Sequence, residues 1–374
     1  MSVKEILAKI TKLGASDIFI VAGRPLSYKV HNQLVDEGEN KLMPGDTATL
    51  IHEIYQLAGD RDIRHLEENG DDDFSFAISG IARFRINTYK QRGSLSAVIR
   101  VINFSIPKPE ELGFSPQTSE LIKRLADLKK GLVLLTGPAG SGKSTTLACM
   151  IDHINSTRQA HIITLEDPLE YLHLHKKSIV SQREVVTDTE SYITALRASL
   201  RQSPDVILLG EMRDYETMST AMTAAETGHL ILSTLHTIGA SNTIDRIIDA
   251  FPPSQQHQIA VQISMVLQAV ISQQLIPAKD GTLVPAFEIM ILNPAIKNMI
   301  RESKIHQIDG VISQSRSEGM ITMDASLLEL VKSGVVDEKV ALEYAQDPDM
   351  LQKRLVSKTI STGIPTATSG FGWL

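Results

Sequence analysis

The chain has 374 residues, of which 42% are hydrophobic and 22% are charged, so it is long enough for two or three globular domains. Its net charge of −7 disfavours a protein whose whole surface binds nucleic acid. The single cysteine, Cys149, excludes an internal disulfide and an all-cysteine zinc site, which favours a cytoplasmic protein. The first residues lack the apolar core of a signal peptide, and no segment approaches the ~20 apolar residues of a membrane span. We therefore expect no direct insertion into a membrane.

Residues 1–105 have the pattern of a small α+β domain. Apolar residues recur at helical spacing over 3–13, which predicts an N-terminal helix. Alternating runs bounded by turn residues predict three short strands, at 18–21, 27–30 and 74–78.

A hairpin is the clearest element of this first region, with strands predicted over 82–89 and 95–101. Strict alternation in its first strand places Arg83 and Arg85 on one face and the apolar side chains on the other. The acidic run 67–73 lacks the spacing of a calcium-binding loop, so we predict a solvated loop there.

The composition changes after a proline-containing linker, 106–118. The region 119–290 alternates helical patterns with nearly continuous apolar strands, which predicts a parallel sheet covered on both faces and hence an α/β fold. The predicted strands of this sheet are 132–135, 162–165, 206–209 and 230–233. The region 291–356 is mainly helical, and 357–374 has the composition of a flexible tail.

Residues 137–144 read GPAGSGKS and match the phosphate-binding pattern G-x-x-x-x-G-K-[ST] in full. An apolar strand runs into this loop and a predicted helix follows it, which is the context that the pattern requires. Glycines let the backbone turn tightly and aim amide N–H groups at phosphate oxygens. Lys143 places its charge between the β- and γ-phosphates, and the Ser144 hydroxyl ligates Mg²⁺. The residues predicted to bind ATP here are Gly137, Pro138, Ala139, Gly140, Ser141, Gly142, Lys143, Ser144 and Thr145.

Two apolar strands end in acidic residues, which a phosphate-binding loop needs for metal and water. Glu211 follows the strand at 206–209, at the position of a Walker B carboxylate. Glu166, Asp167 and Glu170 follow the strand at 162–165. We predict that Glu170 orients the attacking water and that Glu211 holds the metal's water shell, with Glu166 or Asp167 assisting at the metal or in structure. The sequence alone separates these last three carboxylates poorly.

His229 and His236 flank the apolar strand at 230–233 and could line the same crevice, either contacting the γ-phosphate or serving as ordinary polar caps. Cys149 lies in the apolar stripe of the helix after the loop, and we predict a small buried side chain rather than a reactive thiol. His173 and His175 alternate on one face but have no third ligand nearby in sequence, which disfavours a metal site.

Four segments together resemble one family, the secretion-type ATPases of type II secretion and type IV pili. In chain order they read GPAGSGKSTT, ITLEDPLEY, LRQSPDVILLGEMRD and AAETGHLILSTLHT, and the resemblance covers about 3–356. The short N-terminal region, the lack of a cysteine-rich module and the segment AIKNMIRE at 295–302 resemble the family's pilus retraction branch. Lys297 and Met299 depart from that branch's usual arginine and leucine but keep the charge and the apolar character.

This resemblance implies a PAS-like N-terminal domain followed by a RecA-like P-loop ATPase domain. It also implies a homohexamer with ATP at domain interfaces and with arginines of the N-terminal domain reaching phosphate. The candidates for that role are Arg83, Arg85 and Arg100. The resemblance further implies an ATP-hydrolysing motor that removes pilin subunits at the base of a type IV pilus. Such a motor is cytoplasmic and peripheral to the inner membrane, where it works with a platform protein and with an accessory retraction ATPase.

Three alternative functions stay open at this point. The chain could be another motor of the same family, either the accessory retraction paralogue or an assembly ATPase. It could be a RecA-like nucleic-acid translocase, which the net negative charge disfavours. It could be a regulatory subunit that binds ATP without hydrolysis, which the acidic residues after the two strands disfavour.

Overall fold

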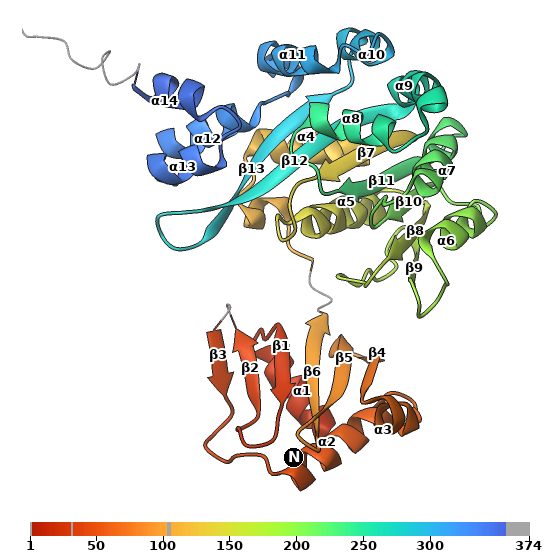
Figure 1. The fold of residues 1–374 in the computed structure, drawn as a ribbon, viewed down its shortest axis with the longest axis vertical. Helices are drawn as coiled ribbons and strands as arrows, with labels where there is room; N and C mark the ends of the chain where they lie inside the picture. Colours follow the sequence, from red (N-terminus) through yellow and green to blue (C-terminus); the bar gives the residue numbers. More distant parts are fainter. Residues whose placement is uncertain (1, 31–32, 103–105, 357–374) are drawn as a thin grey trace, which may run out of the picture. The chain divides into compact units, whose positions relative to one another are not determined.

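A computed structural model describes residues 2–30, 33–102 and 106–356, so the tail predicted at 357–374 lies outside the described residues. The chain forms two compact units, and in Figure 1 its colour runs along the sequence from red at the N-terminus to blue at the C-terminus. The first unit contains 1–106 together with 167–174 and 182–189, and the second contains the rest. Within the described ranges no helix combines the length and the apolar character needed to cross a lipid bilayer.

The first unit is built on a six-stranded antiparallel sheet with strand order β3-β2-β1-β6-β5-β4. The predicted N-terminal helix and hairpin are confirmed, whereas the sequence patterns did not indicate α2, α3 or β3. The elements are α1 (Val3–Lys12), β1 (Asp17–Ile20), β2 (Ser27–Val30), β3 (Gln33–Asp36), α2 (Pro44–Leu57), α3 (Arg64–Asn69), β4 (Asp71–Ile78), β5 (Ala82–Gln91) and β6 (Ser94–Ile102).

Alternation along β4 and β5 builds the core of this unit. Phe76 and Phe84 are buried and their rings lie 5.7 Å apart, while Arg83 and Arg85 occupy the opposite face of β5. Helix α1 begins at a capping box, in which the Ser2 side chain accepts from the Glu5 amide and the Glu5 carboxylate accepts from the Ser2 amide.

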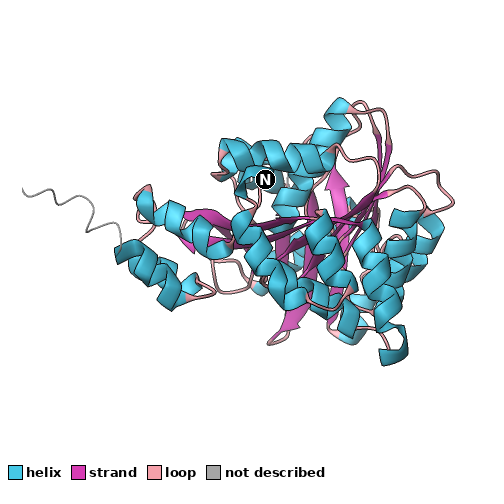
Figure 2. Cartoon of the chain, turned by 90° about the horizontal axis from the view of Figure 1, so that it is seen from above, coloured by secondary structure: helices cyan, strands magenta, loops and turns pink. Residues whose placement is uncertain are grey.

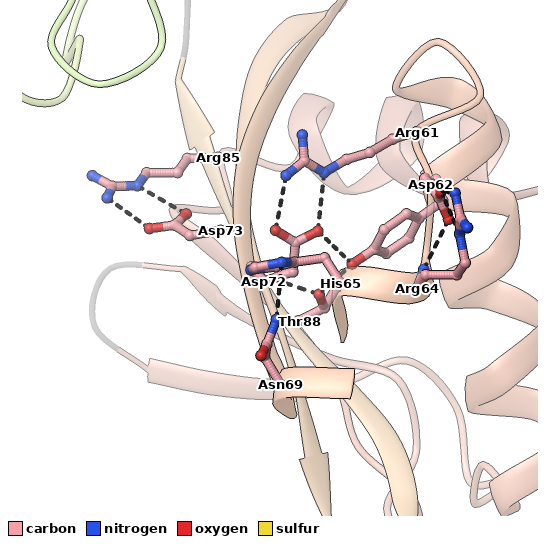
Figure 3. A network of polar contacts seen from close by, with 10 residues as sticks. Arg61, Asp62, Arg64, His65, Asn69, Asp72, Asp73, Arg85 and Thr88 are labelled. Atoms are coloured by element: carbon pink, nitrogen blue, oxygen red, sulfur yellow. Dashed lines mark hydrogen bonds and ion pairs between the residues drawn. The ribbon is translucent and has the colours of Figure 1, made fainter. Parts of the chain in front are cut away.

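The prediction of an acidic loop at 67–73 is wrong, because 67–69 end α3 and 71–73 open β4. Asp72 is buried there because it accepts two hydrogen bonds of 2.9 Å from the Arg61 guanidinium and one of 2.8 Å from the Tyr55 hydroxyl (Figure 3). Arg61 also lies over the ring of Phe74, 4.9 Å from its centroid. An acidic side chain can enter this strand because its charge is fully paired.

The second unit contains the predicted parallel strands and several elements that the sequence patterns did not indicate, notably β9, β12 and β13. Strand β9 (Ile179–Glu184) belongs to the second sheet and lies partly in the first unit's segment 182–189. The other elements are η1 (Pro109–Leu112), α4 (Pro116–Ala126), β7 (Gly131–Thr136), α5 (Lys143–Thr157), β8 (His161–Glu166), α6 (Tyr192–Ser199), β10 (Val206–Leu209), α7 (Tyr215–Glu226), β11 (Leu230–Leu235), α8 (Ala240–Asp249), α9 (Pro253–Val266), β12 (Leu267–Pro277), β13 (Leu283–Ile291), α10 (Pro294–Arg301), η2 (Ile305–Gln307), α11 (Ile308–Gln314), η3 (Arg316–Glu318), α12 (Met323–Lys332), α13 (Glu338–Tyr344) and α14 (Pro348–Val356).

The sheet of the second unit has the order β13-β12-β7-β11-β10-β8-β9. Strands β12, β7, β11, β10 and β8 run parallel to one another, whereas β13 is antiparallel to β12. Alternate residues of β7 pack into two different cores. Leu132 and Leu134 face the helices from α6 to α10, whereas Val133 and Leu135 face α4 and α5. Helices therefore cover both faces (Figure 2), which confirms the predicted α/β, RecA-like fold.

The C-terminal helices α12, α13 and α14 pack around a small core of their own beside the long β12–β13 hairpin (Figure 1). Met323, Leu327 and Leu351 are fully buried there together with Ile276 of β12 and Ala286 of β13. These three helices are thus attached to the hairpin rather than to the middle of the sheet.

Candidate functional site

The parallel strands place the predicted functional motifs at one edge of the second sheet. Because β7, β8, β10 and β11 run in the same direction, their carboxyl ends meet at that edge. The loop beginning at Gly137 follows β7, Glu166 ends β8, Glu211 follows β10 and His236 follows β11. This edge is where the fold would bind a ligand.

The predicted strand, loop and helix are all present around residues 137–145. Helix α5 begins at Lys143 directly after the loop, so its amino terminus points its free amides and the positive end of its dipole into the loop. The Lys143 ammonium donates to the carbonyl oxygens of Gly137 at 2.8 Å and of Pro138 at 2.9 Å. The lysine therefore spans the mouth of the loop, where a triphosphate would compete for its charge.

Gln273 of β12 packs against this loop, although no sequence pattern indicates it. Its side-chain oxygen accepts from the Thr146 hydroxyl at 2.8 Å, and only 2% of Gln273 is exposed. A Cβ on Gly137 would lie 2.1 Å from the Gln273 carbonyl oxygen, and one on Gly142 would lie 2.7 Å from its side-chain nitrogen. Glycine is therefore needed at both positions, because Gln273 leaves no room for a side chain and because the φ values are positive, at 136° and 86°.

A cavity of about 430 Å³ lies beside the loop, within the second unit. Gly142 and Thr145 line it on the loop side, Phe114 on the side of η1, and Leu275 and Pro285 on the side of the β12–β13 hairpin. Its volume lies in the usual range for small-molecule sites, ~300–1,000 Å³. The apolar and aromatic lining suits a planar base placed next to bound phosphates.

Glu211 and His236 face each other at the ends of neighbouring motifs. The Glu211 carboxylate lies 3.5 Å from His236 Nε2 and forms an ion pair with Arg213. The hydrogen bond and charge of Arg213 hold the pKa of Glu211 below its usual value, with a smaller contribution from His236. These groups line a second cavity of about 330 Å³ together with Arg246 of α8. Glu211 is therefore an ionised carboxylate at this edge at neutral pH.

Glu166, the last residue of β8, lies beside the residue that precedes Glu211. Gly210, the residue before Glu211, donates its amide to the Leu165 carbonyl at 2.8 Å, and a Cβ on Gly210 would lie 3.4 Å from the Glu166 Cα. Glu170 is exposed and belongs to the segment 167–174, which clusters with the first unit.

The three candidate arginines all lie in the first unit and each has an acidic partner. Arg85 makes a two-point contact with Asp73, at 2.8 and 3.3 Å (Figure 3). Arg100, which is exposed and lies opposite Arg85 in the β5–β6 register, pairs with Asp17 at 3.3 Å. Arg83 donates to the Ser75 hydroxyl at 2.6 Å and to Glu184, of the segment 182–189, at 2.8 Å.

The structure places His229 away from the predicted nucleotide site of its own chain. His229 precedes β11, so it lies at the amino edge of the sheet, and its carbonyl accepts from the amide of Gly131 at the start of β7. Strand β11 has six residues at ~3.3 Å each, which separates His229 from His236 by roughly 20 Å. The His229 ring nitrogen Nδ1 lies 2.9 Å from the Ala224 carbonyl, which makes it a local cap.

Cys149 is buried in α5, as predicted, with its thiol 2.9 Å from the Pro107 carbonyl. Burial raises the pKa of this thiol to about 12, so it stays protonated and unreactive at neutral pH.

The residues at the loop fit a bound nucleotide and a magnesium ion. The Ser141 hydroxyl is buried in the loop with no hydrogen-bond partner among the described residues, as expected of a group aimed at a ligand. The described ranges hold no cluster of three or more His, Cys, Asp or Glu side chains able to hold a metal by themselves. Mg²⁺ is usually held by one or two protein groups together with phosphate oxygens and water, and Ser144, Glu166 and Glu211 supply groups of that kind.

A comparison with known protein families matches residues 1–359 to the family described as "Type II/IV secretion system protein". The chain belongs to this secretion ATPase family. The family match covers both compact units, so the phosphate-binding loop and the N-terminal arginines lie within one family module.

Individual members of the secretion ATPase family resemble the chain over nearly its full length. It is 45% identical over 349 residues to the type IV pilus retraction ATPase PilT of Pseudomonas aeruginosa, covering 93% of this chain and 99% of the relative. It is 37% identical over 373 residues to the type IV pilus ATPase PilU of the same organism, covering 99% and 96%. A crystal structure of the pilus retraction motor PilT with bound ADP matches with a TM-score of 0.85 and 45% identity, covering 94% of this chain and 99% of that one.

Proposed function

We propose that this protein is an ATP-hydrolysing motor that drives retraction of type IV pili. The observation that carries the proposal is the phosphate-binding loop, which packs against Gln273 on one side and lines a cavity of about 430 Å³. The 45% identity to PilT over nearly the whole chain, against 37% to PilU, favours the retraction ATPase over the accessory paralogue.

ATP binding is assigned to the loop 137–145. Its amides and the amino terminus of α5 contact the phosphates, and Lys143 exchanges the carbonyls of Gly137 and Pro138 for phosphate oxygens. The base occupies the cavity between Phe114 and the β12–β13 hairpin. Preorganised donors suit this reaction because phosphoryl transfer depends mainly on positioning and on charge stabilisation.

Hydrolysis is assigned to the carboxylates at the same edge together with Glu170 of the segment 167–174. Glu170 orients the attacking water, while Glu211, kept ionised by Arg213, holds the water shell of the metal. Mg²⁺ bound by Ser144 and the phosphates, with Glu166 nearby, would neutralise charge on the phosphate oxygens. His236 contacts Glu211 and is therefore placed to respond when the γ-phosphate leaves.

Arginines of the first unit complete the site in a homohexamer, in which one subunit supplies them to its own or a neighbouring nucleotide. Arg83, Arg85 and Arg100 keep this role as candidates, because a planar guanidinium suits the charge that develops during phosphoryl transfer. His229, at the far edge of its own sheet, contacts nucleotide only if a neighbouring subunit presents that edge. The motor is cytoplasmic and works at the inner membrane through the pilus platform protein, with an accessory retraction ATPase as a further partner.

A complementation experiment tests the retraction function. Cells that lack the gene should carry excess pili and fail to spread by twitching, and the wild-type gene should restore both properties. The Lys143→Ala gene should restore neither, whereas Lys129→Ala, an exposed lysine before β7, should restore both. Normal pilus number and twitching in the deletion strain would contradict the retraction function.

A further inference from the structure

Helix α8, which follows the loop after His236, begins without a capping side chain of its own. Its N-cap is Gly239, whose φ of 89° is a value that side-chain-bearing residues rarely adopt. A helix start leaves amides that need acceptors, and two side chains from the β12–β13 hairpin supply them. The Gly239 amide donates to the Ser272 hydroxyl at 3.0 Å, and the Ala240 amide donates to the Glu288 carboxylate at 2.7 Å.

Glu288 is a carboxylate buried deep in the unit, with 2% of the residue exposed. Burial raises the pKa of Glu288 above its usual value, with a further contribution from the charge of Asp309, and the hydrogen bonds that it accepts from Ala240, Met323 and Gln346 offset only part of this rise. It forms no ion pair with any residue in the described ranges. A buried carboxylate is costly unless its oxygens are hydrogen-bonded, so these contacts keep it in one place.

The second oxygen of Glu288 faces the C-terminal helices. The Gln346 side chain donates to it at 3.1 Å, and the amide of Met323, the first residue of α12, lies 3.5 Å away. Gln346 is itself fixed to α12, because its backbone amide donates to Asp324 at 2.8 Å. The carboxylate therefore joins the start of α8 to the small core formed by α12, α13 and α14.

Gly239 marks how closely these parts approach each other. A Cβ at this position would lie 3.2 Å from the Gln346 side-chain nitrogen and 3.6 Å from the Glu288 carboxylate. Only two residues lie between Gly239 and His236, whose ring contacts Glu211 at 3.5 Å. A shift of the loop after β11 would therefore press directly on Glu288 and Gln346.

We propose that Glu288 is a positioning residue that transmits the nucleotide state from His236 to helices α12–α14. The proposal rests on the proposed function, because it takes the edge with Glu211 and His236 as the nucleotide site. Movement of the loop after β11 carries the Ala240 amide with it, and Glu288 passes that movement through Gln346 to Asp324 and α12. The C-terminal helices then change position with each ATP cycle.

Hydrogen exchange of the full-length protein, with and without the slowly hydrolysed analogue ATPγS, tests this coupling. In the wild type, ATPγS should slow exchange both in 131–157, around the loop, and in 323–355. In Glu288→Gln, whose amide group faces donors, and in Gln346→Ala, the effect on 131–157 should persist and the effect on 323–355 should fall at least fivefold. The matched control Glu343→Gln, an exposed residue of α13, should behave as the wild type.

A merely structural Glu288 would give a different pattern, because a loosened fold exchanges faster in both nucleotide states and keeps the difference between them. Gln346→Ala removes only the link to the C-terminal helices and leaves the contact with Ala240 in place. The coupling is overturned if both variants retain the full response in 323–355, or if the wild type shows none there. Absence of any ATPγS effect at 131–157 in the wild type would overturn the nucleotide site and the coupling together.

Discussion

Replacing Gly142 with alanine should weaken ATP binding by an amount that follows from the loop's geometry. Gly142 has a φ of 86°, where an alanine costs ~1–2 kcal/mol. Its Cβ would lie 2.7 Å from the Gln273 side-chain nitrogen and displace the amide that binds Thr146, a loss of ~1 kcal/mol. The free loop of the variant can avoid this strain by leaving its phosphate-binding form, so the cost falls on ATP binding. The total of about 2–3 kcal/mol then corresponds to roughly a 25- to 150-fold loss of affinity for ATP.

Gly140 provides a matched control, because its φ of 75° is similar and its Cβ would meet nothing within 4 Å. Gly140→Ala carries only the conformational cost, so it should bind about fivefold more tightly than Gly142→Ala. Titration with a fluorescent ATP analogue gives the dissociation constants, and circular dichroism melting checks that each variant is folded. Equal affinities for the two variants, or wild-type affinity for Gly142→Ala, would refute the role assigned to Gln273.

Three further predictions concern other parts of the molecule. Glu170→Gln should bind ATP with near wild-type affinity but hydrolyse it roughly 100-fold more slowly or worse, because the glutamine fills the same space but cannot accept a proton from water. Loss of ATP binding in an equilibrium titration would instead make Glu170 a metal or structural residue. Asp72→Asn should lower the free energy of unfolding by about 2–3 kcal/mol at pH 7. Burial raises the pKa of Asp72, but the hydrogen bonds from Arg61 and Tyr55 outweigh this effect and leave the pKa below its usual value. The stabilisation by Asp72 is therefore complete above the pKa of the unfolded state, about 3.9, and is lost as the pH falls through the lower pKa of the folded state. Urea unfolding at pH 7 and pH 3 measures the change, and an equal loss at both pH values would contradict the assignment. Cys149, with a pKa of about 12, should resist iodoacetamide at pH 8 in the native protein and react once urea unfolds it, as mass spectrometry can show; rapid native modification would place the thiol at the surface.

The sequence predicts the middle of the second sheet well, because each of its parallel strands is an apolar run that ends in a polar motif. Strand β12 lacks both signals. Helix α9 ends at Val266 and β12 begins at the next residue, so no turn signal separates them. The centre of β12 carries the polar residues Ser272, Gln273 and Gln274, which are typical of a surface segment. All three are buried, and the first two are polar because they support α8 and the phosphate-binding loop.

The candidate site shows the same division between what is local and what is not. The loop, Glu166, Glu211 and His236 could be placed from sequence because each follows a strand of known direction. His229 belongs to the same motif but precedes the strand that His236 follows, so the length of β11 places it at the opposite edge of the sheet. The acidic pattern around Asp72 predicts a loop, because its partners Tyr55 and Arg61 are distant in sequence and only the fold brings them together.

Phosphate release by the purified protein is the most direct measurement of the central claim, which is that the loop between β7 and α5 holds a triphosphate for cleavage. The wild type should release phosphate from ATP continuously in the presence of Mg²⁺. Lys143→Ala should melt at the wild-type temperature and release none above background. Undiminished turnover by that folded variant, or no turnover by the wild type, would contradict the account.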